Sequence, residues 1–292
     1  MKKIIALGFF DGVHLGHQAL LSACAGLAEQ LRATPAAITF ETHPQSFFTN
    51  NPPALINTAT DRDRLLKQYG MAEIISLPVS EKVMSTHWET FLEDLLAQDA
   101  AGFVCGSDFR FGHKGEGDAA KLQAFCAMRN LPCAIVPEQL LEGIRISSTH
   151  IRALLEQGEM AKAVRFLGHP HILSGEVISG RRLGRTLGIP TANLALPEDL
   201  VQPKRGVYAC RVALDGKMYA AVTNIGNRPT VGGHHTTVEP WILDFDGDLY
   251  GKEITLEFYA YLRQEEKFPS LEDLKQQIHR DADAAREIVC TM

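Results

Sequence analysis

The hydrophobic pattern of this 292-residue chain changes after Gly168, and that change constrains the possible folds more than any other feature. Before Gly168, short apolar runs typical of buried strands alternate with segments whose apolar residues recur at helical spacing. The expected strands span residues 4–10, 36–40, 73–77, 102–105 and 133–136, and the expected helices span residues 17–31, 59–69, 88–96 and 119–128. Strands that alternate with helices form a parallel sheet covered on both faces. In the helix at 59–69 we expect the Arg and Lys side chains to lie on the outer face.

After Gly168 the helical spacing disappears, and strand-like segments follow one another at short intervals. The expected strands span residues 174–178, 206–214, 218–223, 237–245 and 253–262. The dipeptide Asp215-Gly216 indicates a hairpin turn, and strands without intervening helices favour a small antiparallel barrel. A last helix is expected to begin at Ser270, with Asp273 three residues further on. We place the domain boundary within residues 158–172, which gives domains at 1–165 and 166–292.

Charge and cysteine content exclude several classes of function. The net charge of −6 argues against a general nucleic-acid binder, because affinity for the phosphate backbone comes from clustered Lys and Arg. The six cysteines are scattered without a Cys-x-x-Cys pair, which is typical of buried, reduced thiols in a cytoplasmic protein. No apolar run approaches the ~18 residues that a membrane span needs. We therefore expect a cytoplasmic protein that binds neither nucleic acid nor membrane.

The first candidate site is Gly8–His17 (GFFDGVHLGH), which lies where an expected strand passes into an expected helix. His14 and His17 are three residues apart, so they share one face at the start of the helix. The first-turn amides and the positive end of the helix dipole attract phosphate at such a position. The alternative is a glycine-rich turn with two surface histidines. The strand–loop–helix context favours phosphate binding.

Two further segments of the first half carry polar groups in similar positions. Gly106–Gly112 (GSDFRFG) follows an expected strand, and ligands of parallel sheets bind at the carboxyl ends of strands. The alternative there is a turn with an exposed ion pair. In Ile146–Arg152 (ISSTHIR), the hydroxyls and Arg152 could hold a triphosphate, although Ser and Thr at a helix start are also ordinary caps.

The second half contains the glycine-rich, basic segment Gly180–Asn193 (GRRLGRTLGIPTAN). It lacks the Gly-Lys-Ser/Thr ending of a P-loop, which excludes a Walker-type kinase. Thr191 and Asn193 supply neutral oxygens on one face of an extended chain, and these groups suit Mg²⁺ shared with nucleotide phosphates. Loop amides can also cradle phosphates, and the residues expected to do so are Gly180, Gly184 and Arg185. The alternative is a loop that is basic by chance.

Glu239 stands within an apolar strand-like segment, where a carboxylate is costly unless it has a task or a partner. If it is partly desolvated, it could act as a general base toward a primary alcohol. The alternative is an edge-strand residue that faces water.

Taken in order, these segments resemble the nucleotidyltransferase superfamily with a His-x-Gly-His signature and, more specifically, the bacterial riboflavin kinase/FMN adenylyltransferase family. The segments that carry the resemblance are Phe10–His17, Thr39–Pro44, Gly106–Gly112, Ile146–Arg152, Gly184-Arg185, Pro190–Asn193, Gly206–Tyr208, Asn224–Thr230, Glu239, Leu249–Gly251 and Phe268–Ala285. The resemblance implies a doubly wound, Rossmann-like nucleotidyltransferase domain, followed by a small antiparallel β-barrel kinase domain with a terminal helix.

The resemblance also implies a function and a set of roles. Riboflavin is phosphorylated by ATP to FMN, and FMN is adenylylated to FAD with release of pyrophosphate. Glu239 is implied as the base of the kinase site, with Thr191 and Asn193 holding Mg²⁺ and ATP. His14, His17 and Arg152 are implied as catalytic groups of the adenylyltransferase site. The expected ATP contacts there are Gly8, Phe9, Asp11, His14, His17, Asp108, Ser147, Ser148, Thr149 and Arg152.

Some residues depart from the family pattern, and two other functions stay open. His169 and His171 replace an Arg and a Tyr at the junction, and we interpret them as loop histidines. A chain with only kinase activity and a degenerate first domain is one alternative. A non-catalytic flavin-binding module is the other. In each case we expect small-molecule ligands and a monomer or weak homo-oligomer.

Overall fold

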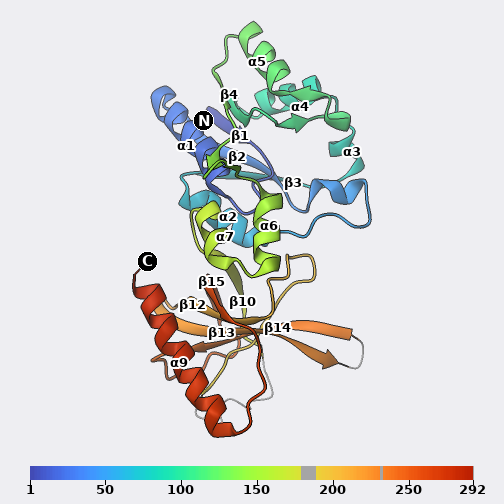
Figure 1. Cartoon of the computed structure of the whole chain (residues 1–292). Helices are drawn as coiled ribbons and strands as arrows, with labels where there is room; N and C mark the ends of the chain where they lie inside the picture. Colours follow the sequence, from blue (N-terminus) through green and yellow to red (C-terminus); the bar gives the residue numbers. More distant parts are fainter. Residues whose placement is uncertain (179–188, 231–232, 292) are drawn as a thin grey trace. The chain divides into compact units, whose positions relative to one another are not determined.

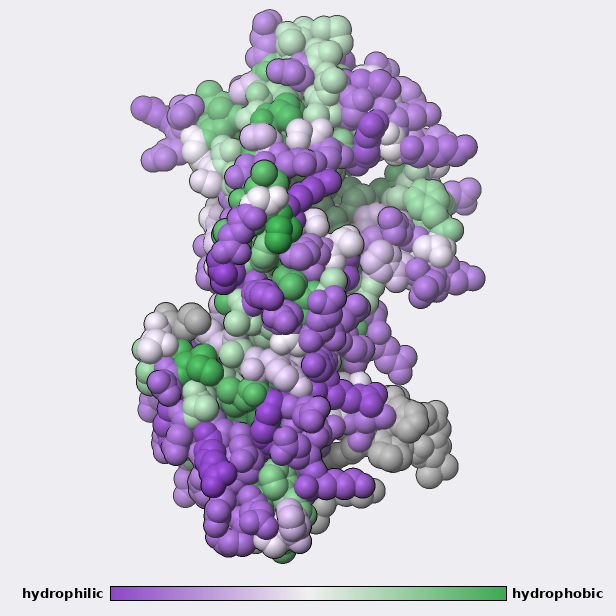
Figure 2. Space-filling view, in the orientation of Figure 1, coloured by the Kyte–Doolittle hydropathy of each residue, from purple (hydrophilic) through white to green (hydrophobic). Residues whose placement is uncertain are grey.

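The structure is a computed structural model, and it describes residues 1–178, 189–230 and 233–291. The chain forms two compact units, Met1–Ser148 and Thr149–Met292, coloured from blue to green and from green to red in Figure 1. Within the described residues, no helix is long and apolar enough to cross a membrane. On the face shown in Figure 2, hydrophilic residues predominate and hydrophobic ones form separate patches.

The first unit contains a five-stranded parallel sheet in the order β3-β2-β1-β4-β7. Its strands are β1 (Lys3–Leu7), β2 (Thr34–Phe40), β3 (Glu73–Leu77), β4 (Ala100–Gly106) and β7 (Cys133–Val136). The helices are α1 (Leu15–Leu31), α2 (Ala59–Gln68), α3 (Glu81–Met84), α4 (Trp88–Ala97) and α5 (Ala119–Met128). The expected doubly wound, Rossmann-like fold is confirmed. Because the strand order reverses between β1 and β4, the ends of these two strands flank the crevice where such folds bind ligands.

Hydrophobic side chains of β1 pack on both faces of this sheet. Ile5 and Leu7 pack in one core cluster with Leu92 of α4 and Phe125 of α5. The alternate residues, which include the fully buried Ile4, point to the opposite face, where α1 packs against β1. This continuous burial explains why the strands appear in the sequence as short apolar runs.

Short elements complete the first unit. They are the 3₁₀ helices η1 (Pro44–Phe47) and η2 (His113–Gly115) and the hairpin strands β5 (Arg110–Phe111), β6 (Gly117–Asp118), β8 (Leu140–Leu141) and β9 (Ile144–Arg145). The sequence did not predict these hairpins, because two-residue strands leave no periodic signal.

The second unit is a nearly closed antiparallel barrel with strand order β10-β15-β12-β13-β14-β11. The strands are β10 (His171–Glu176), β11 (Leu194–Ala195), β12 (Gly206–Leu214), β13 (Lys217–Thr230), β14 (Gly233–Ile242) and β15 (Glu253–Arg263). Near the two ends of this order, the amide of Ile178 donates to the carbonyl of Asn193 (2.9 Å), which draws the edges together. The expected small barrel is confirmed.

The described part of the second unit includes α6 (Ser148–Gln157), which begins at the last residue of the first unit, α7 (Met160–Leu167) and α9 (Leu271–Cys290). The terminal helix α9 begins as predicted, because the Ser270 hydroxyl accepts a hydrogen bond from the Asp273 amide (3.1 Å). Ala282 and Ala285 of α9 pack against Val207 and Val222 of the barrel. Residues 149–165 group with the second unit, whereas the sequence-based boundary assigned them to the first domain.

Several expectations are wrong in detail. Arg62, expected on the outer face of its helix, is fully buried. Strand β14 ends at Ile242 rather than at 245, because the chain turns at Asp244, which has a positive φ of 58°. His169 and His171 are both buried; His169 lies in the loop between α7 and β10 as expected, whereas His171 begins β10 and is not a loop histidine. Among the cysteines, Cys290 is exposed.

Candidate functional site

The loop Gly8–His14 connects β1 to α1 and is held rigid by its own apolar residues. Phe10 and Val13 are fully buried although their φ angles are positive (59° and 38°), so packing compensates for a costly backbone. His14 is the N-cap of α1, and its side chain accepts a hydrogen bond from the amide of His17 (3.3 Å). The loop therefore directs two imidazoles to the amino end of a 17-residue helix.

The rings of His14 and His17 stack, with centroids 3.6 Å apart and an interplanar angle of 12°. Since Nδ1 of His14 accepts the amide hydrogen, a neutral His14 carries its proton on Nε2. Burial lowers the pKa of His17 well below its ordinary value of 6.5, and the nearby His14 adds to the decrease. In the neutral form, each ring can donate one hydrogen bond to an anion.

The segment before α6 lies beside this loop. The Ser148 hydroxyl donates to the carbonyl of Asp11 (2.9 Å), and a Cβ on Gly16 would come within 3.9 Å of the Ile146 carbonyl. The structure thus brings the first and third sequence motifs together. Ser147 precedes Ser148 directly. Thr149 and Arg152 follow it in α6 and belong to the second unit.

Two acidic residues of the expected ATP site make protein contacts. The Asp11 carboxylate is buried and accepts a hydrogen bond from the Ile56 amide (2.8 Å), which ties the loop to the segment before α2. Asp108 is exposed and forms an ion pair with Arg145 of the β8–β9 hairpin. Their roles in nucleotide binding stay predictions.

A cavity of about 540 Å³ opens beside Gly8 and Phe9, at the carboxyl ends of β1, β2 and β4. Its wall is rich in aromatic side chains: Phe9, Phe40, Phe48, Phe91, Phe109 and Phe111. At its rim Gly112 adopts a positive φ of 74°, and a Cβ there would come within 2.6 Å of Trp88 Cα. Sequence reasoning missed this cavity, because its lining comes from many separate segments, and only the Phe-Arg-Phe of residues 109–111 gave a signal.

The second unit holds a cavity of about 340 Å³ between the barrel and α9, and Glu239 lines it. Glu239 is half-buried on β14, directly opposite Asn224 of β13, whose side-chain amide donates to Glu265 (3.0 Å). The floor includes a buried ion pair between Arg263 and Asp281 of α9, with Nη2 to Oδ2 at 2.8 Å. Glu239 is therefore placed on a pocket wall rather than on a fully exposed edge.

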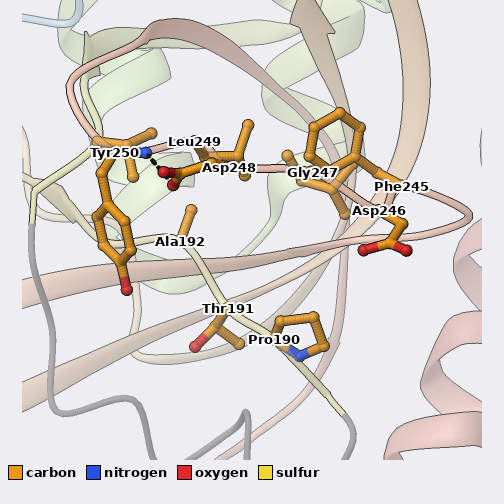
Figure 3. A pocket seen from close by; sticks show the side chains of 11 residues that line it. Pro190, Thr191, Ala192, Phe245, Asp246, Gly247, Asp248, Leu249 and Tyr250 are labelled. Carbon is orange, nitrogen blue, oxygen red and sulfur yellow. Dashed lines mark hydrogen bonds between the residues drawn. The ribbon is translucent and has the colours of Figure 1, made fainter.

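The second unit also holds a smaller cavity of about 150 Å³. Thr191 lines both this cavity and the 340 Å³ cavity, so the two adjoin. Thr191 is fixed by an antiparallel bridge to Trp241. In Figure 3 the hydroxyls of Thr191 and Tyr250 point toward the same side, and the Tyr250 amide donates to Asp248 (3.1 Å). Asn193, two residues after Thr191 in the chain, is buried. Gly180, Gly184 and Arg185 lie outside the described residues.

Comparison with known proteins decides the family. A family model described as FAD synthetase matches residues 1–150, and one described as riboflavin kinase matches residues 167–289. A curated bifunctional riboflavin kinase/FMN adenylyltransferase from Escherichia coli K12 is 36% identical over 288 residues, or 97% of this chain and 92% of its own. The corresponding protein from Listeria monocytogenes is 33% identical over 290 residues, or 98% and 92%.

The chain belongs to the bifunctional riboflavin kinase/FMN adenylyltransferase family.

A solved structure adds a likeness in fold. A crystal structure described as a macrolide-efflux protein from Streptococcus pneumoniae is 30% identical, with a TM-score of 0.88 over 98% of this chain and 94% of that chain. Both parts of the riboflavin kinase/FMN adenylyltransferase are present here. The protein is a bifunctional transferase that phosphorylates riboflavin to FMN and adenylylates FMN to FAD. A kinase with a degenerate first domain and a non-catalytic flavin-binding module are not favoured.

Proposed function

We propose that adenylyl transfer takes place at the His14–His17 pair and that riboflavin phosphorylation takes place at Glu239. The observation that supports this division most is that each half of the chain has its own cavity beside its own polar group. We keep the functional boundary near residue 165, because the family matches cover 1–150 and 167–289 and leave the boundary between them.

In the first half, a phosphate oxygen of FMN attacks the α-phosphorus of ATP, and the bond from that phosphorus to the pyrophosphate oxygen breaks. The FMN phosphate is already an anion, so this step needs no base. His14 and His17 donate hydrogen bonds to oxygens that gain charge in the transition state, and the amino end of α1 adds its dipole. The remaining expected ATP contacts are Gly8, Phe9, Asp11, Asp108, Ser147, Ser148, Thr149 and Arg152.

The aromatic cavity of the first half suits the ring system of FMN. Its volume of about 540 Å³ lies in the usual range for pockets that bury a ligand of this size. Flat aromatic walls stack on a flat heterocycle, and the cavity begins at Gly8 and Phe9, in the same loop as the histidines. A flavin that enters there has its phosphate end free to approach His14 and His17.

In the second half, Glu239 takes the proton of the ribityl 5′-hydroxyl while its oxygen attacks the γ-phosphorus of ATP, and the bond from that phosphorus to ADP breaks. The cavity of about 340 Å³ holds the riboflavin, and the adjoining smaller cavity holds part of the nucleotide. Thr191 stands where the two cavities meet, which is where the transferred phosphoryl group has to pass.

Mg²⁺ fits this part of the protein as a partner of the nucleotide. The Thr191 hydroxyl and the Asn193 amide offer neutral oxygen ligands, and the described residues contain no group of three or more His, Cys, Asp or Glu that could hold a metal by itself. The cation would therefore need phosphate oxygens to complete its shell, and it would neutralise charge on the phosphates. Gly180, Gly184 and Arg185 are proposed as further phosphate contacts.

One experiment tests the proposed division. The protein is incubated with ATP and MgCl₂ and either riboflavin or FMN, and the flavins are separated by chromatography with and without EDTA. We expect FMN and then FAD from riboflavin, FAD from FMN, and neither product with EDTA. Phosphorylation that persists in EDTA would remove the proposed role of Thr191 and Asn193.

We also propose that the protein works in the cytoplasm on small molecules, as a monomer or a weak homo-oligomer. All six cysteines are free, which agrees with a reducing compartment. The net charge of −6 supports the absence of nucleic-acid binding.

A further inference from the structure

Arg62 is a fully buried arginine in the adenylyltransferase half, on the inner side of α2. Helix α2 begins after the N-cap Thr58, so Arg62 lies near its second turn. Arginine is almost never fully buried unless its charge is paired. None of the site residues described above explains why this position holds a guanidinium group.

The guanidinium group of Arg62 is only partly satisfied. Nη2 donates a hydrogen bond to the carbonyl oxygen of Phe40, and Cζ lies 4.8 Å from the centroid of the Phe9 ring. Nε and Nη1 are buried and have no hydrogen-bond partner in the part of the chain that the structure describes. Burial lowers the pKa of Arg62, whereas the charges of Asp11 and Asp63 raise it.

Packing alone does not account for this residue. A buried charge with two unbonded nitrogens costs stability, and an apolar side chain of similar volume would fill the space at a lower cost. The position is therefore better explained by what the guanidinium contacts than by its contribution to the core.

Both contacts of Arg62 lie in the wall of the 540 Å³ cavity, which Phe9 and Phe40 line. The Phe9 ring contacts two groups: the guanidinium of Arg62, and the ring of His43, whose centroid is 5.0 Å away at an interplanar angle of 72°. Phe9 also belongs to the loop that carries His14. A shift of the Phe9 ring would change both the cavity wall and the start of this loop.

We propose that Arg62 is a positioning residue of the adenylyl-transfer site: it fixes the Phe9 ring and the Phe40 backbone, so that the flavin ring of FMN docks with its phosphate directed toward His14 and His17. The proposal rests on the proposed placement of FMN in the aromatic cavity. The planar guanidinium can hold a ring face and a carbonyl at the same time, whereas the ammonium of lysine is a point charge without a plane.

The test compares Arg62→Lys and Arg62→Met with Arg64→Met, a matched control on the same helix whose side chain is 44% exposed. KM for FMN, KM for ATP and kcat are measured for adenylyl transfer, and flavin fluorescence quenching gives the Kd of FMN. We expect KM and Kd for FMN to rise roughly tenfold in both Arg62 variants, which is the size of a lost cation–π contact with a lost hydrogen bond to a charged group. KM for ATP and all values of Arg64→Met should change less than about twofold.

Two further measurements keep the test decisive. Thermal unfolding followed by circular dichroism shows whether the first half of each variant is folded, and Arg62→Lys serves if Arg62→Met does not fold. Phe109→Ala, which changes the cavity at a residue away from Arg62, reports on the cavity itself.

If Phe109→Ala weakens FMN binding and the Arg62 variants do not, the cavity assignment stands and the role of Arg62 is wrong. Equal increases of KM for FMN and ATP in the Arg62 variants would indicate a merely structural residue, and this also overturns the proposal. If Phe109→Ala leaves FMN binding unchanged, the placement of the flavin fails and the inference fails with it.

Discussion

The imidazole rings of His14 and His17 lie parallel and in contact, 3.6 Å apart between centroids. Two protonated rings at this distance would repel each other strongly, and the amino end of α1 would add to the repulsion. The pair therefore disfavours double protonation, and burial together with the neighbouring His14 lowers the pKa of His17. This arrangement leads to the first two predictions.

Replacement of His17 by Ala should lower kcat for FAD formation from FMN by about 100- to 1000-fold, because it removes one preorganised donor to the transition state. FMN formation from riboflavin should be unchanged. Chromatography of the flavins after reaction with each substrate measures both rates. His87→Ala, at an exposed histidine of the same half, is the control. A comparable loss of both activities in the His17 variant would argue against separate sites.

The stability of the first half should depend on pH through His17. Its pKa in the folded protein lies below the ordinary value of 6.5, so the unfolded chain binds the proton more readily. The contribution of neutral His17 to the free energy of unfolding is fully present above pH 6.5. It should be lost as the pH drops below that value toward the pKa of His17 in the folded protein. Thermal unfolding at a series of pH values from about 7.5 down to about 5 checks this. In His17→Asn the slope should be smaller, and an unaltered slope would contradict the assignment.

Replacement of Glu239 by Gln should lower FMN formation by about 100-fold or more, because the amide keeps the shape of the side chain and cannot accept the proton. FAD formation from added FMN should persist at its normal rate. Initial rates with riboflavin and with FMN, measured separately, test both statements. Glu253→Gln, an exposed glutamate at the start of β15, is the control. If riboflavin is still phosphorylated at the normal rate, Glu239 is not the base.

The ion pair of Arg263 and Asp281 should stabilise both the second half and its cavity. The side chains are 16% and 5% exposed, so Asp281→Ala leaves a buried guanidinium without its partner. We expect a loss of about 3–5 kcal/mol in the free energy of unfolding. KM for riboflavin should also rise, because both residues line the cavity.

Urea unfolding and kinase kinetics measure these two effects. Asp283→Ala, on the same helix at a carboxylate that is 81% exposed, should change stability by less than about 0.5 kcal/mol. Similar losses in the two variants would show that the helix, and not the ion pair, is responsible.

The sequence predicts most of the fold because its strands and helices leave clear local signals, such as apolar runs, helical spacing and side-chain caps. The apolar runs of β1 and β4 are short and buried on both faces, and the start of α9 has a side-chain cap at Ser270. The predicted end of β14 is wrong, because no sequence rule places a positive φ at Asp244. Arg62 was placed on the outside for a similar reason: a charged residue in a helix is normally exposed, and only the tertiary contacts with Phe9 and Phe40 reverse this.

The sequence predicts some parts of the candidate sites and misses others. Motifs that are continuous in sequence, such as Gly8–His17, were found with their neighbours, and the structure places Ser148 beside Asp11. The aromatic cavity was not found, because its wall is assembled from residues far apart in the chain. Cavities of this kind depend on how loops pack, which the local pattern of hydrophobic residues does not encode.

The helix α9 supplies one wall of the 340 Å³ cavity, where we propose that riboflavin binds, and it is the last element of the described chain. A ribosome makes the chain from its amino end, so the barrel strands emerge before the wall that closes their pocket. The adenylyltransferase half can therefore mature while the kinase half still lacks this wall of its cavity. During synthesis, the enzyme that performs the second reaction of the pair is complete before the one that performs the first.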